Sequence, residues 1–261
     1  MRRTRLFPNA SDFPEPFRPL IENNPVYASS CSKAAQVWLL DGDGGLYLKS
    51  AAAGSLKTEA DMTRYFHSLS LGAEVLAHLS EERDWLLTKR IPGEDCVFPD
   101  YLAQPRRLCD TLASLLRQLH ETPFSGCPVT DRCAAYRAAV ERNHSAGQYD
   151  AALFPDSWGF SSEEEAWHLI QTNGKYLKSD TLLHGDYCLP NIILDRWKFS
   201  GFVDLDSSGV GDRHIDLFWG VWTLFFNLKT NAYYDRFLDA YGRDRVEPEL
   251  LRTVAAFETF L

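Results

Sequence analysis

Residues 181–195, TLLHGDYCLPNIILD, hold the most informative pattern of this sequence. An apolar run leads into His184-Gly185-Asp186, and Asn191 follows five residues after Asp186. A second apolar run, GFVDLD at residues 201–206, reaches an aspartate at Asp204. A single Asp or Asn beside a strand is usually a turn or capping residue. The joint spacing of the three is much harder to obtain by chance and indicates a site.

Phosphoryl transfer from ATP explains this set of side chains. The reaction needs a carboxylate that orients the attacking hydroxyl and accepts its proton, and Asp186 fits that role. It also needs hard oxygen ligands for Mg²⁺, which Asn191 and Asp204 can supply. The neutral Asn amide avoids concentrating negative charge beside the triphosphate. We interpret His184 as a brace of the loop through hydrogen bonds and not as a reacting group.

Toward the N-terminus, two short strand-like runs surround a glycine-rich turn. Residues 36–40 (QVWLL) and 46–49 (LYLK) flank residues 41–45 (DGDGG), which predicts a β-hairpin. The glycines could alternatively cradle a phosphate. A phosphate cradle should lead into a helix or cover a nucleotide, however, whereas this turn joins two strands.

The rest of the first ninety residues favours antiparallel sheet with one inserted helix. We expect the helix over 56–70 and further strands over 74–78 and 85–89. The first 25 residues contain five prolines, and we expect a lead-in without a helix there. Ile91-Pro92-Gly93 breaks the pattern and predicts a linker.

Beyond Gly93 the chain is predicted to be helical. Residues 102–120 carry leucines at helical spacing, and only 182–206 again favours strands. Further helices are expected near 132–147, 162–178, 214–229, 231–241 and 247–260. The fold class is therefore α+β, with a small antiparallel-sheet lobe over 1–91, a hinge near 89–93 and a larger helical lobe over 92–261.

Composition limits the classes of protein and partner. The chain has 261 residues, 45% hydrophobic and 24% charged, as in ordinary globular proteins, and no apolar run long enough to cross a bilayer. Its net charge of -9 argues against nucleic acid and anionic membranes as partners. Pro8 and Asn9 follow a basic N-terminus without the apolar core of a signal peptide. The six cysteines form no C-x-x-C pair, which indicates free thiols in the cytoplasm and no zinc site.

The quoted motifs resemble those of the aminoglycoside phosphotransferases, a group within a protein-kinase-like superfamily that also contains choline kinases. The run 184–191 is similar to the H-G-D-x-C-L-P-N of the 3'-phosphotransferases, and 201–204 is similar to their G-F-I-D. Asp212 and Asp216-Leu217 match the family's later aspartates. The resemblance implies a bilobal kinase-like fold, a nucleotide (ATP or GTP) and Mg²⁺.

The resemblance also implies nucleotide-binding residues in the N-terminal lobe. Lys49 matches the lysine that binds the ATP phosphates, and Glu59 matches the glutamate that pairs with it; alone, each could be a solvated surface charge. Ser32, in the run 29–32, matches the serine of a loop that closes over the phosphates. Lys89 to Ile91 resembles the hinge whose backbone bonds the adenine edge.

The C-terminus is similar to the family's acidic-aromatic final helix, whose carboxylates bind substrate ammonium groups. Glu258 and the terminal carboxylate of Leu261 could serve here, although Thr259 stands where the family usually has a second acid. The final helix could equally dock on the core without binding substrate. Further candidate acids for the substrate loop are Asp150, Asp156, Glu163 and Glu164.

Two departures from the family pattern affect the acceptor side. Leu205-Asp206-Ser207 follows Asp204 where relatives commonly have Gly and Arg, so an arginine near the transferred phosphate is missing. Aromatic residues replace much of the charge that relatives carry on the helix after Asp216. These residues are Trp219, Trp222, Phe225 and Phe226, followed by Asn227. Such a stripe is usually core; alternatively it makes a less polar acceptor pocket.

Three functions stay open at this point. The first is ATP-dependent phosphorylation of a cationic aminoglycoside, at its 3'-hydroxyl, which gives resistance. The second is the same chemistry on another small hydroxyl compound, either a different antibiotic or a metabolite. The third is a binding protein without turnover, against which the intact Asp186, Asn191, Asp204 and Lys49 argue. We expect a monomer or weak dimer.

Overall fold

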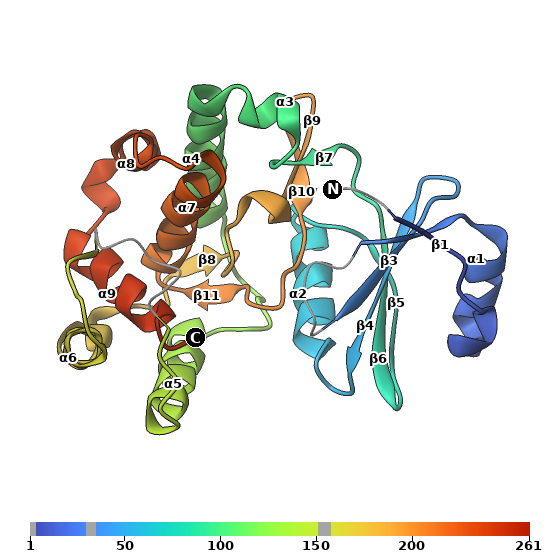
Figure 1. Cartoon of the computed structure of the whole chain (residues 1–261), viewed down its shortest axis with the longest axis horizontal. Coiled ribbons are helices and arrows are strands. Elements are labelled where there is room, and N and C mark those ends of the chain that lie inside the picture. Colours follow the sequence, from blue (N-terminus) through green and yellow to red (C-terminus); the bar gives the residue numbers. More distant parts are fainter. Residues whose placement is uncertain (1–3, 30–34, 151–157) are drawn as a thin grey trace. The chain divides into compact units, whose positions relative to one another are not determined.

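The computed structural model describes residues 4–29, 35–150 and 158–261. Their contacts divide the chain into two compact units. The first runs to Phe98 and includes Pro190–Asp206, and the second contains Pro99–Leu189 and Ser207–Leu261. Figure 1 shows the sheet of the first unit and the helices of the second. The hinge near 89–93 stays a prediction.

The first unit is built on a six-stranded antiparallel sheet with the order β1-β2-β3-β4-β6-β5. The predicted hairpin is present, since Leu40 pairs with Leu46 across the turn that Gly44 and Gly45 make with φ of 77° and 71°. The strands are β1 (Thr4–Leu6), β2 (Val26–Ala28), β3 (Gln36–Leu40), β4 (Leu46–Ala52), β5 (Val75–Ser80) and β6 (Arg83–Lys89).

The expectation of a helix-free lead-in is wrong. Helix α1 (Arg18–Asn23) forms there after two 3-10 turns, Ala10–Asp12 and Glu15–Phe17. Pro19 lies in the first turn of α1, where a missing N–H costs no helical hydrogen bond. Phe13, Phe17 and Ile21 are buried in one cluster with residues of the sheet, so tertiary packing stabilises this short helix.

A second, three-stranded sheet carries two of the predicted metal ligands. It has the order β10-β9-β7, with β7 (Glu94–Asp95), β9 (Ile192–Asp195) and β10 (Lys198–Phe202). Ile192 pairs with Phe202 in antiparallel register, so Asn191 before β9 and Asp204 after β10 come to the same end of this hairpin. The remaining helix of the unit, α2 (Lys57–Ser68), buries Ala60 against Ala51 and Leu86 of the larger sheet.

The second unit is mainly helical, as predicted. Helix α7 starts at the N-cap Asp212, and helices α4 and α7 pack against each other and against α8. The two-stranded pair of β8 (Thr181–Leu183) and β11 (Gly209–Gly211) carries the segment that leads to Asp186. The helices are α3 (Pro99–Leu102), α4 (Pro105–Glu121), α5 (Arg132–Ser145), α6 (Glu163–Asn173), α7 (Arg213–Leu228), α8 (Tyr234–Tyr241) and α9 (Pro248–Glu258).

The α+β fold class is therefore confirmed, and the expected helices differ from those observed mainly at their ends. The short strands β1, β2, β7 and β11 were not predicted, since two or three residues carry no periodicity. No helix within the described ranges is long and apolar enough to cross a membrane.

Candidate active site

Three charged side chains of the first unit meet at the ammonium of Lys49. Lys49 Nζ on β4 lies 2.8 Å from Glu59 Oε2 on α2 and 2.7 Å from Asp204 Oδ1 after β10. The side chains of Lys49 and Glu59 are only 19% and 7% exposed, so neither is a solvated surface charge. The structure thus brings together three residues that are widely separated in the sequence.

Burial and charge act in opposite directions on this cluster. Burial raises the pKa of the Glu59 carboxyl to about 7, although the Lys49 ammonium opposes the shift. Burial alone would lower the pKa of Lys49, but the charges of Glu59 and Asp204 outweigh it and raise that pKa. Lys49 is therefore a fixed positive charge, suited to bind phosphate oxygens.

Asn191 and Asp204 lie at adjacent positions, as the β9–β10 register requires. The N–H of Val203 donates to the carbonyl of Asn191 at 3.0 Å, and Asp204 follows with a left-handed φ of 61°. The Asp204 side chain is 52% exposed and can accept further ligands. One amide and one carboxylate fit Mg²⁺, which is usually bound by few protein ligands together with phosphates and water. Within the described residues no cluster of three or more His, Cys, Asp or Glu forms a metal site.

The other predicted nucleotide residues occupy the end of β6 or fall outside the described chain. The N–H of Lys89 donates to the carbonyl of Glu74 at 2.9 Å, and its ammonium lies 2.7 Å from the Glu74 carboxylate. Ile91 packs so closely on Gly201 that a Cβ there would lie 2.6 Å from Ile91 Cδ1. Ser32 lies outside the described residues, as does Asp156 of the predicted substrate loop.

The loop that carries Asp186 is fixed in the second unit by Asp216 of α7. This buried carboxylate accepts the N–H groups of His184 and Gly185, both at 2.7 Å. Buried His120 of α4 lies 3.2 Å from the same carboxylate through Nε2 and contacts the Tyr241 hydroxyl through Nδ1 at 2.8 Å. The sequence alone did not point to His120 or Tyr241. The only signal was a polar residue, His120, at the end of an apolar helix face.

The turn at Gly185 leaves room for no other residue. Its φ is 83°, and a Cβ there would lie 1.9 Å from the carbonyl oxygen of Ser207. The N–H of Asp186 donates to Nδ1 of His184 at 3.3 Å, so His184 braces the loop from within. The Asp186 side chain is consequently held on the surface of the unit, partly exposed.

Glu258, near the end of the chain, lies in a pocket of neutral hydrogen-bond donors. Its Oε1 accepts the Tyr136 hydroxyl of α5 at 2.6 Å and the Trp219 indole N–H of α7 at 3.1 Å. Burial raises the pKa of Glu258 to about 7, the two donors oppose the shift, and the negative charge of Asp186 adds to it. The charge of Asp186 therefore reaches Glu258. The Tyr136 and Trp219 contacts had no signal in the sequence.

The last residues of the chain differ in their exposure. Thr259 is buried, and its hydroxyl donates to the carbonyl of Ala256 at 2.7 Å, so this position packs against the protein and does not face a ligand. Leu261 is 53% exposed. The terminal helix thus docks on the core and also keeps one partly exposed carboxylate, Glu258, beside the loop of Asp186.

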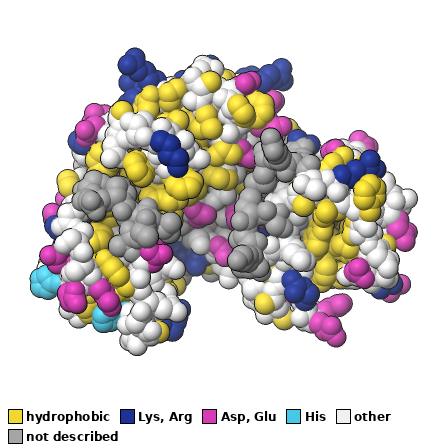
Figure 2. Space-filling model, in the orientation of Figure 1, with side chains coloured by type: hydrophobic (Ala, Val, Ile, Leu, Met, Phe, Trp, Pro, Cys, Tyr) yellow, Lys and Arg dark blue, Asp and Glu magenta, His cyan; other side chains and the backbone are white. Residues whose placement is uncertain are grey.

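The aromatic residues of α7 divide between two faces of the helix. Phe218, Val221 and Leu224 are buried in the unit, whereas Trp219 and Trp222 are partly exposed and Phe226 is 47% exposed. In the face drawn in Figure 2, hydrophobic side chains gather over the region of α7. The interpretation of the predicted stripe as core is therefore wrong, since Trp219, Trp222 and Phe225 are partly exposed and Phe226 is exposed.

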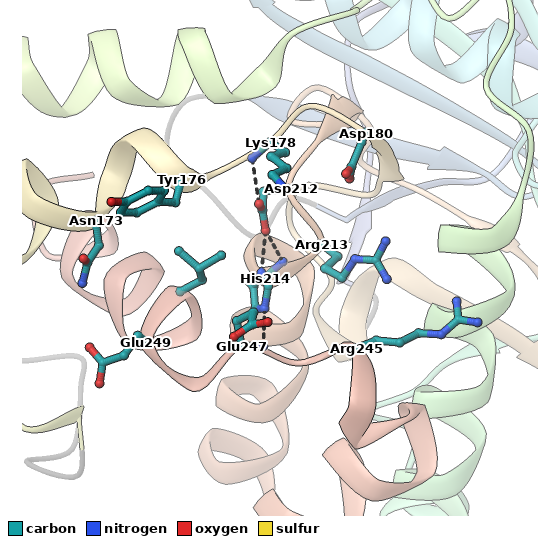
Figure 3. Close-up of a pocket in the computed structure, with 11 residues that line it drawn as sticks. Asn173, Tyr176, Lys178, Asp180, Asp212, Arg213, His214, Arg245, Glu247 and Glu249 are labelled. Carbon is teal, nitrogen blue, oxygen red and sulfur yellow. Dashed lines mark hydrogen bonds and ion pairs between the residues drawn. The ribbon is translucent and has the colours of Figure 1, made fainter.

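A separate polar pocket is lined by the first residues of α7 (Figure 3). Asp212 accepts the N–H of Lys178 at 2.8 Å and contacts Nδ1 of His214 at 2.6 Å. Nε2 of His214 accepts the N–H of Glu247 at 2.9 Å, which places the ring proton on Nδ1. Asp212 and His214 thus join three chain segments, and their hydrogen-bonding groups are used in that bracing.

The chain is similar in sequence to known phosphotransferases, which agrees with the arrangement of Lys49, Glu59 and Asp204. Residues 29–252 match the model of the phosphotransferase enzyme family, APH. The chain belongs to this family. It is 48% identical over 253 residues to a probable aminoglycoside 3'-phosphotransferase of Lactococcus lactis, covering 97% of this chain and 96% of that protein. An aminoglycoside 3'-phosphotransferase of Streptomyces fradiae is 29% identical over 220 residues, with 80% and 81% covered.

Solved structures extend the likeness to the fold. The crystal structure of an aminoglycoside-3'-phosphotransferase of type VIII has a TM-score of 0.70 and 25% identity, covering 90% of this chain and 94% of that one. An aminoglycoside phosphotransferase of Streptomyces rimosus, in complex with ADP and streptomycin, has a TM-score of 0.66 and 22% identity, with 89% and 92% covered. The resemblance stated from the motifs is confirmed, and this family member is an enzyme with the predicted kinase-like fold.

Proposed function

We propose that this phosphotransferase moves the γ-phosphoryl group of ATP to a hydroxyl of an aminoglycoside, at the 3' position. The contact of Lys49 with both Glu59 and Asp204 carries the nucleotide part of the proposal. A charged lysine fixed between two carboxylates is the arrangement that phosphoryl transfer needs beside a triphosphate. The relatives named as aminoglycoside 3'-phosphotransferases support the acceptor.

The first unit would bind the nucleotide. Lys49 would contact the α- and β-phosphates, and Glu59 would hold its ammonium in place. The N–H groups of Lys89 and Arg90 are used by the carbonyls of Glu74 and Gly45. Ile91, the next backbone position of the predicted hinge, would meet the adenine edge. Ser32 would belong to the loop over the phosphates.

Asn191 and Asp204 would hold Mg²⁺. When bound there, the ion would screen the negative charge on the β- and γ-phosphates. Asp204 also contacts Lys49, so the same carboxylate would connect the lysine with the metal.

Asp186 would orient the acceptor hydroxyl and accept its proton. The hydroxyl oxygen forms a bond to the γ-phosphorus while the bond from that phosphorus to the bridging oxygen breaks, and ADP leaves. The backbone contacts of Asp216 with His184 and Gly185 would keep Asp186 in position during this step. An anchored loop matters because misplacement of a reacting group by about 1 Å costs about 10²-fold in rate.

The acceptor would be a cationic amino sugar. Glu258 and the terminal carboxylate of Leu261 would bind its ammonium groups, with Asp156 as a further candidate on the substrate loop. Ion pairs to ammonium groups would give specificity for polyamines over neutral alcohols. Phosphorylation would remove the drug's ribosome binding and so give resistance.

A coupled ADP-release assay with purified enzyme, Mg²⁺ and ATP tests the proposal. Kanamycin, neomycin and several alcohols that are not aminoglycosides would be the acceptors, and Asp186→Ala the blank. We expect release with kanamycin or neomycin that is absent from the blank, and mapping of the phosphate to the 3' oxygen. Release with none of the aminoglycosides would overturn the acceptor assignment.

A second candidate is the same reaction on another small hydroxyl compound. The specific observation in its favour is the partly exposed aromatic face of α7. The family that the motifs resemble commonly carries charged residues on this helix. ADP release only with alcohols that are not aminoglycosides would favour this second candidate.

A further inference from the structure

Three aromatic side chains form a continuous stripe along one face of α7. Trp219 and Trp222 meet edge to face with ring centroids 5.2 Å apart, and Trp222 stacks on Phe226 at 4.9 Å with planes 13° apart. The residues are three and four positions apart, which places them on one side of the helix. We call these three residues the aromatic stripe.

The rings of the stripe contact one another, and Trp219 also meets buried Phe218 edge to face at 5.3 Å, yet the stripe is not buried. Phe226 is 47% exposed, and Trp219 and Trp222 are partly exposed. Exposing large rings to water has a free-energy cost of about 25 cal/mol per Å² of apolar surface. Folding alone would favour smaller or polar residues here, so the stripe needs another explanation.

One end of the stripe already holds a cation. The ammonium of Lys229 lies 4.2 Å from the centroid of the Phe226 ring. Aromatic faces attract ammonium groups through their quadrupole, and Trp attracts them more strongly than Phe. The stripe therefore has the chemistry to bind an ammonium group along its length, with Lys229 occupying one position.

The other end of the stripe touches the predicted acceptor carboxylate. The indole N–H of Trp219 donates to Oε1 of Glu258 at 3.1 Å, and the charge of Asp186 acts on Glu258. The Cys188 thiol, two residues after Asp186, is affected by the charges of both carboxylates. Asp186, Glu258 and the Trp219 end of the stripe thus belong to one part of the second unit.

We propose that Trp219 and Trp222 form an aromatic wall of the acceptor site, which binds one ammonium-bearing sugar ring of the substrate against the carboxylate of Glu258. The inference rests on the proposed function and names the chain's own specificity-determining residues for it. The ring's C–H face packs on the indoles while its ammonium lies between the π-face and the carboxylate. In this enzyme, recognition by aromatic contact replaces part of the recognition by charge.

Charge complementarity selects this occupant over others. The carboxylates of Glu258 and Asp186 disfavour an anionic ligand, and a purely apolar ligand would remove water from Glu258 without supplying a cation. A sugar ring that carries an ammonium satisfies both the rings and the carboxylate. A second copy of the chain or an aromatic antibiotic would use the indoles alone.

The test compares Trp222→Leu with Trp222→Phe in the full-length enzyme. Leu keeps apolar volume without a π-face, whereas Phe keeps the π-face. We expect Trp222→Leu to raise the KM for kanamycin by about tenfold, with the KM for ATP unchanged, and Trp222→Phe to restore most of the loss. The KM for an alcohol without amino groups should change much less. An unchanged KM for kanamycin in Trp222→Leu would overturn the inference.

Tyr176→Ala is the matched control. Tyr176 is 55% exposed and carries the Lys175 ammonium 5.1 Å from its ring centroid, so it is a similar cation–aromatic pair on the same unit but outside the stripe. Its loss should leave the KM for kanamycin unchanged. An equal rise in Tyr176→Ala and Trp222→Leu would show a general effect of removing an exposed aromatic ring, and would overturn the assignment of the stripe.

Failure of the proposed function gives a different result. If the wild-type enzyme releases no ADP with any aminoglycoside, the acceptor assignment fails, and kanamycin binding is then measured by quenching of tryptophan fluorescence. Saturable quenching that Trp222→Leu removes would uphold the ammonium-binding wall. The absence of quenching in the wild type would overturn it.

Discussion

Glu59 of the first unit and Glu258 of the second are both carboxylates whose pKa burial raises to about 7, yet their partners differ. The partner of Glu59 is a cation, Lys49, at 2.8 Å. The partners of Glu258 are the neutral donors Tyr136 and Trp219, and within residues 4–29, 35–150 and 158–261 no Lys, Arg or His forms an ion pair with it.

This difference separates a structural role from a binding role. Glu59 is neutralised within the chain, so it can fix Lys49 but has little charge to offer a ligand. Among the described residues, the neutral donors Tyr136 and Trp219 stabilise the charge of Glu258, and the nearby charge of Asp186 disfavours it. A ligand ammonium would relieve that cost, because a buried charge without a counter-ion is expensive.

Asp186→Ala should have the largest effect, because it removes both the proposed base and the charge that acts on Glu258. We expect kcat to fall by about 10³-fold, within the range for loss of a general base. The ADP-release assay measures the loss, and an unchanged circular dichroism spectrum shows that the fold is intact. A kcat within tenfold of the wild-type value would contradict the assigned role.

Lys49→Met tests the structural role assigned to Glu59, because it removes the cation that Glu59 contacts. The variant loses the cation that would bind the phosphates, and we expect kcat/KM for ATP to fall by about 10²-fold. Glu59 would then take up a proton near neutral pH, because burial raises its pKa. Lys57→Met is the matched control, since Lys57 forms an exposed pair with Asp61 on the same unit. Equal losses in the two variants would contradict a specific role for Lys49.

The pH dependence of acceptor binding tests the binding role assigned to Glu258. Burial raises the pKa of Glu258 to about 7, so the carboxyl is largely neutral at pH 6 and largely ionised at pH 8. The KM for kanamycin should therefore fall by up to about tenfold between these values, following the ionised fraction. Glu258→Gln should remove this part of the dependence, and an identical pH profile in the variant would exclude Glu258 as the titrating group.

The raised pKa of the Glu258 carboxyl also predicts that the stability of the fold depends on pH, which can be measured without an activity assay. A carboxyl with a raised pKa in the folded state favours folding while it is protonated. That contribution is lost as the pH rises through about 7. The melting temperature of Glu258→Gln relative to wild type should consequently be higher at pH 8 than at pH 5. A difference that is constant with pH would show that folding does not raise the pKa of this carboxyl.

Tyr136→Phe should have the smallest effect. The Tyr136 hydroxyl donates to Glu258 at 2.6 Å and lowers its pKa, so its removal should move the acceptor pH profile upward. We expect less than about a threefold rise in KM at pH 8, because a single hydrogen bond contributes about 1 kcal/mol. Phe keeps the ring that stacks on Phe257 at 4.9 Å. A profile shifted downward would contradict the donor role.

Much of the phosphate chemistry could be read from local sequence. The spacing of Asp186 and Asn191 follows from one loop, and the β9–β10 hairpin brings Asn191 and Asp204 to one end because antiparallel register is local. The hairpin of β3 and β4 had an equally local signal in its glycines. Lys49 and Glu59 needed the family resemblance, because a lysine in a strand and a glutamate in a helix are common.

The acceptor side was less predictable, and α1 was missed for a related reason. Periodicity shows that α7 is apolar, but Phe218 and Trp219 are equally apolar and only one of them is fully buried. The prolines of the first 25 residues disfavoured a helix, yet Phe13 and Phe17 gain enough from burial against the sheet to stabilise one. Which apolar face is buried depends on neighbours that are distant in the chain.

The family, the α+β fold class and the trio of Asp186, Asn191 and Asp204 follow from the amino-acid sequence alone, because the spacing of that trio is set within one loop and one hairpin. Only the tertiary structure decided the environment of Glu258, whose donors Tyr136 and Trp219 are 122 and 39 residues away, and the exposure of the aromatic stripe. Local spacing fixes which groups share a loop. Burial and long-range packing fix whether a carboxylate meets a cation, a neutral donor or solvent, and those neighbours set its charge.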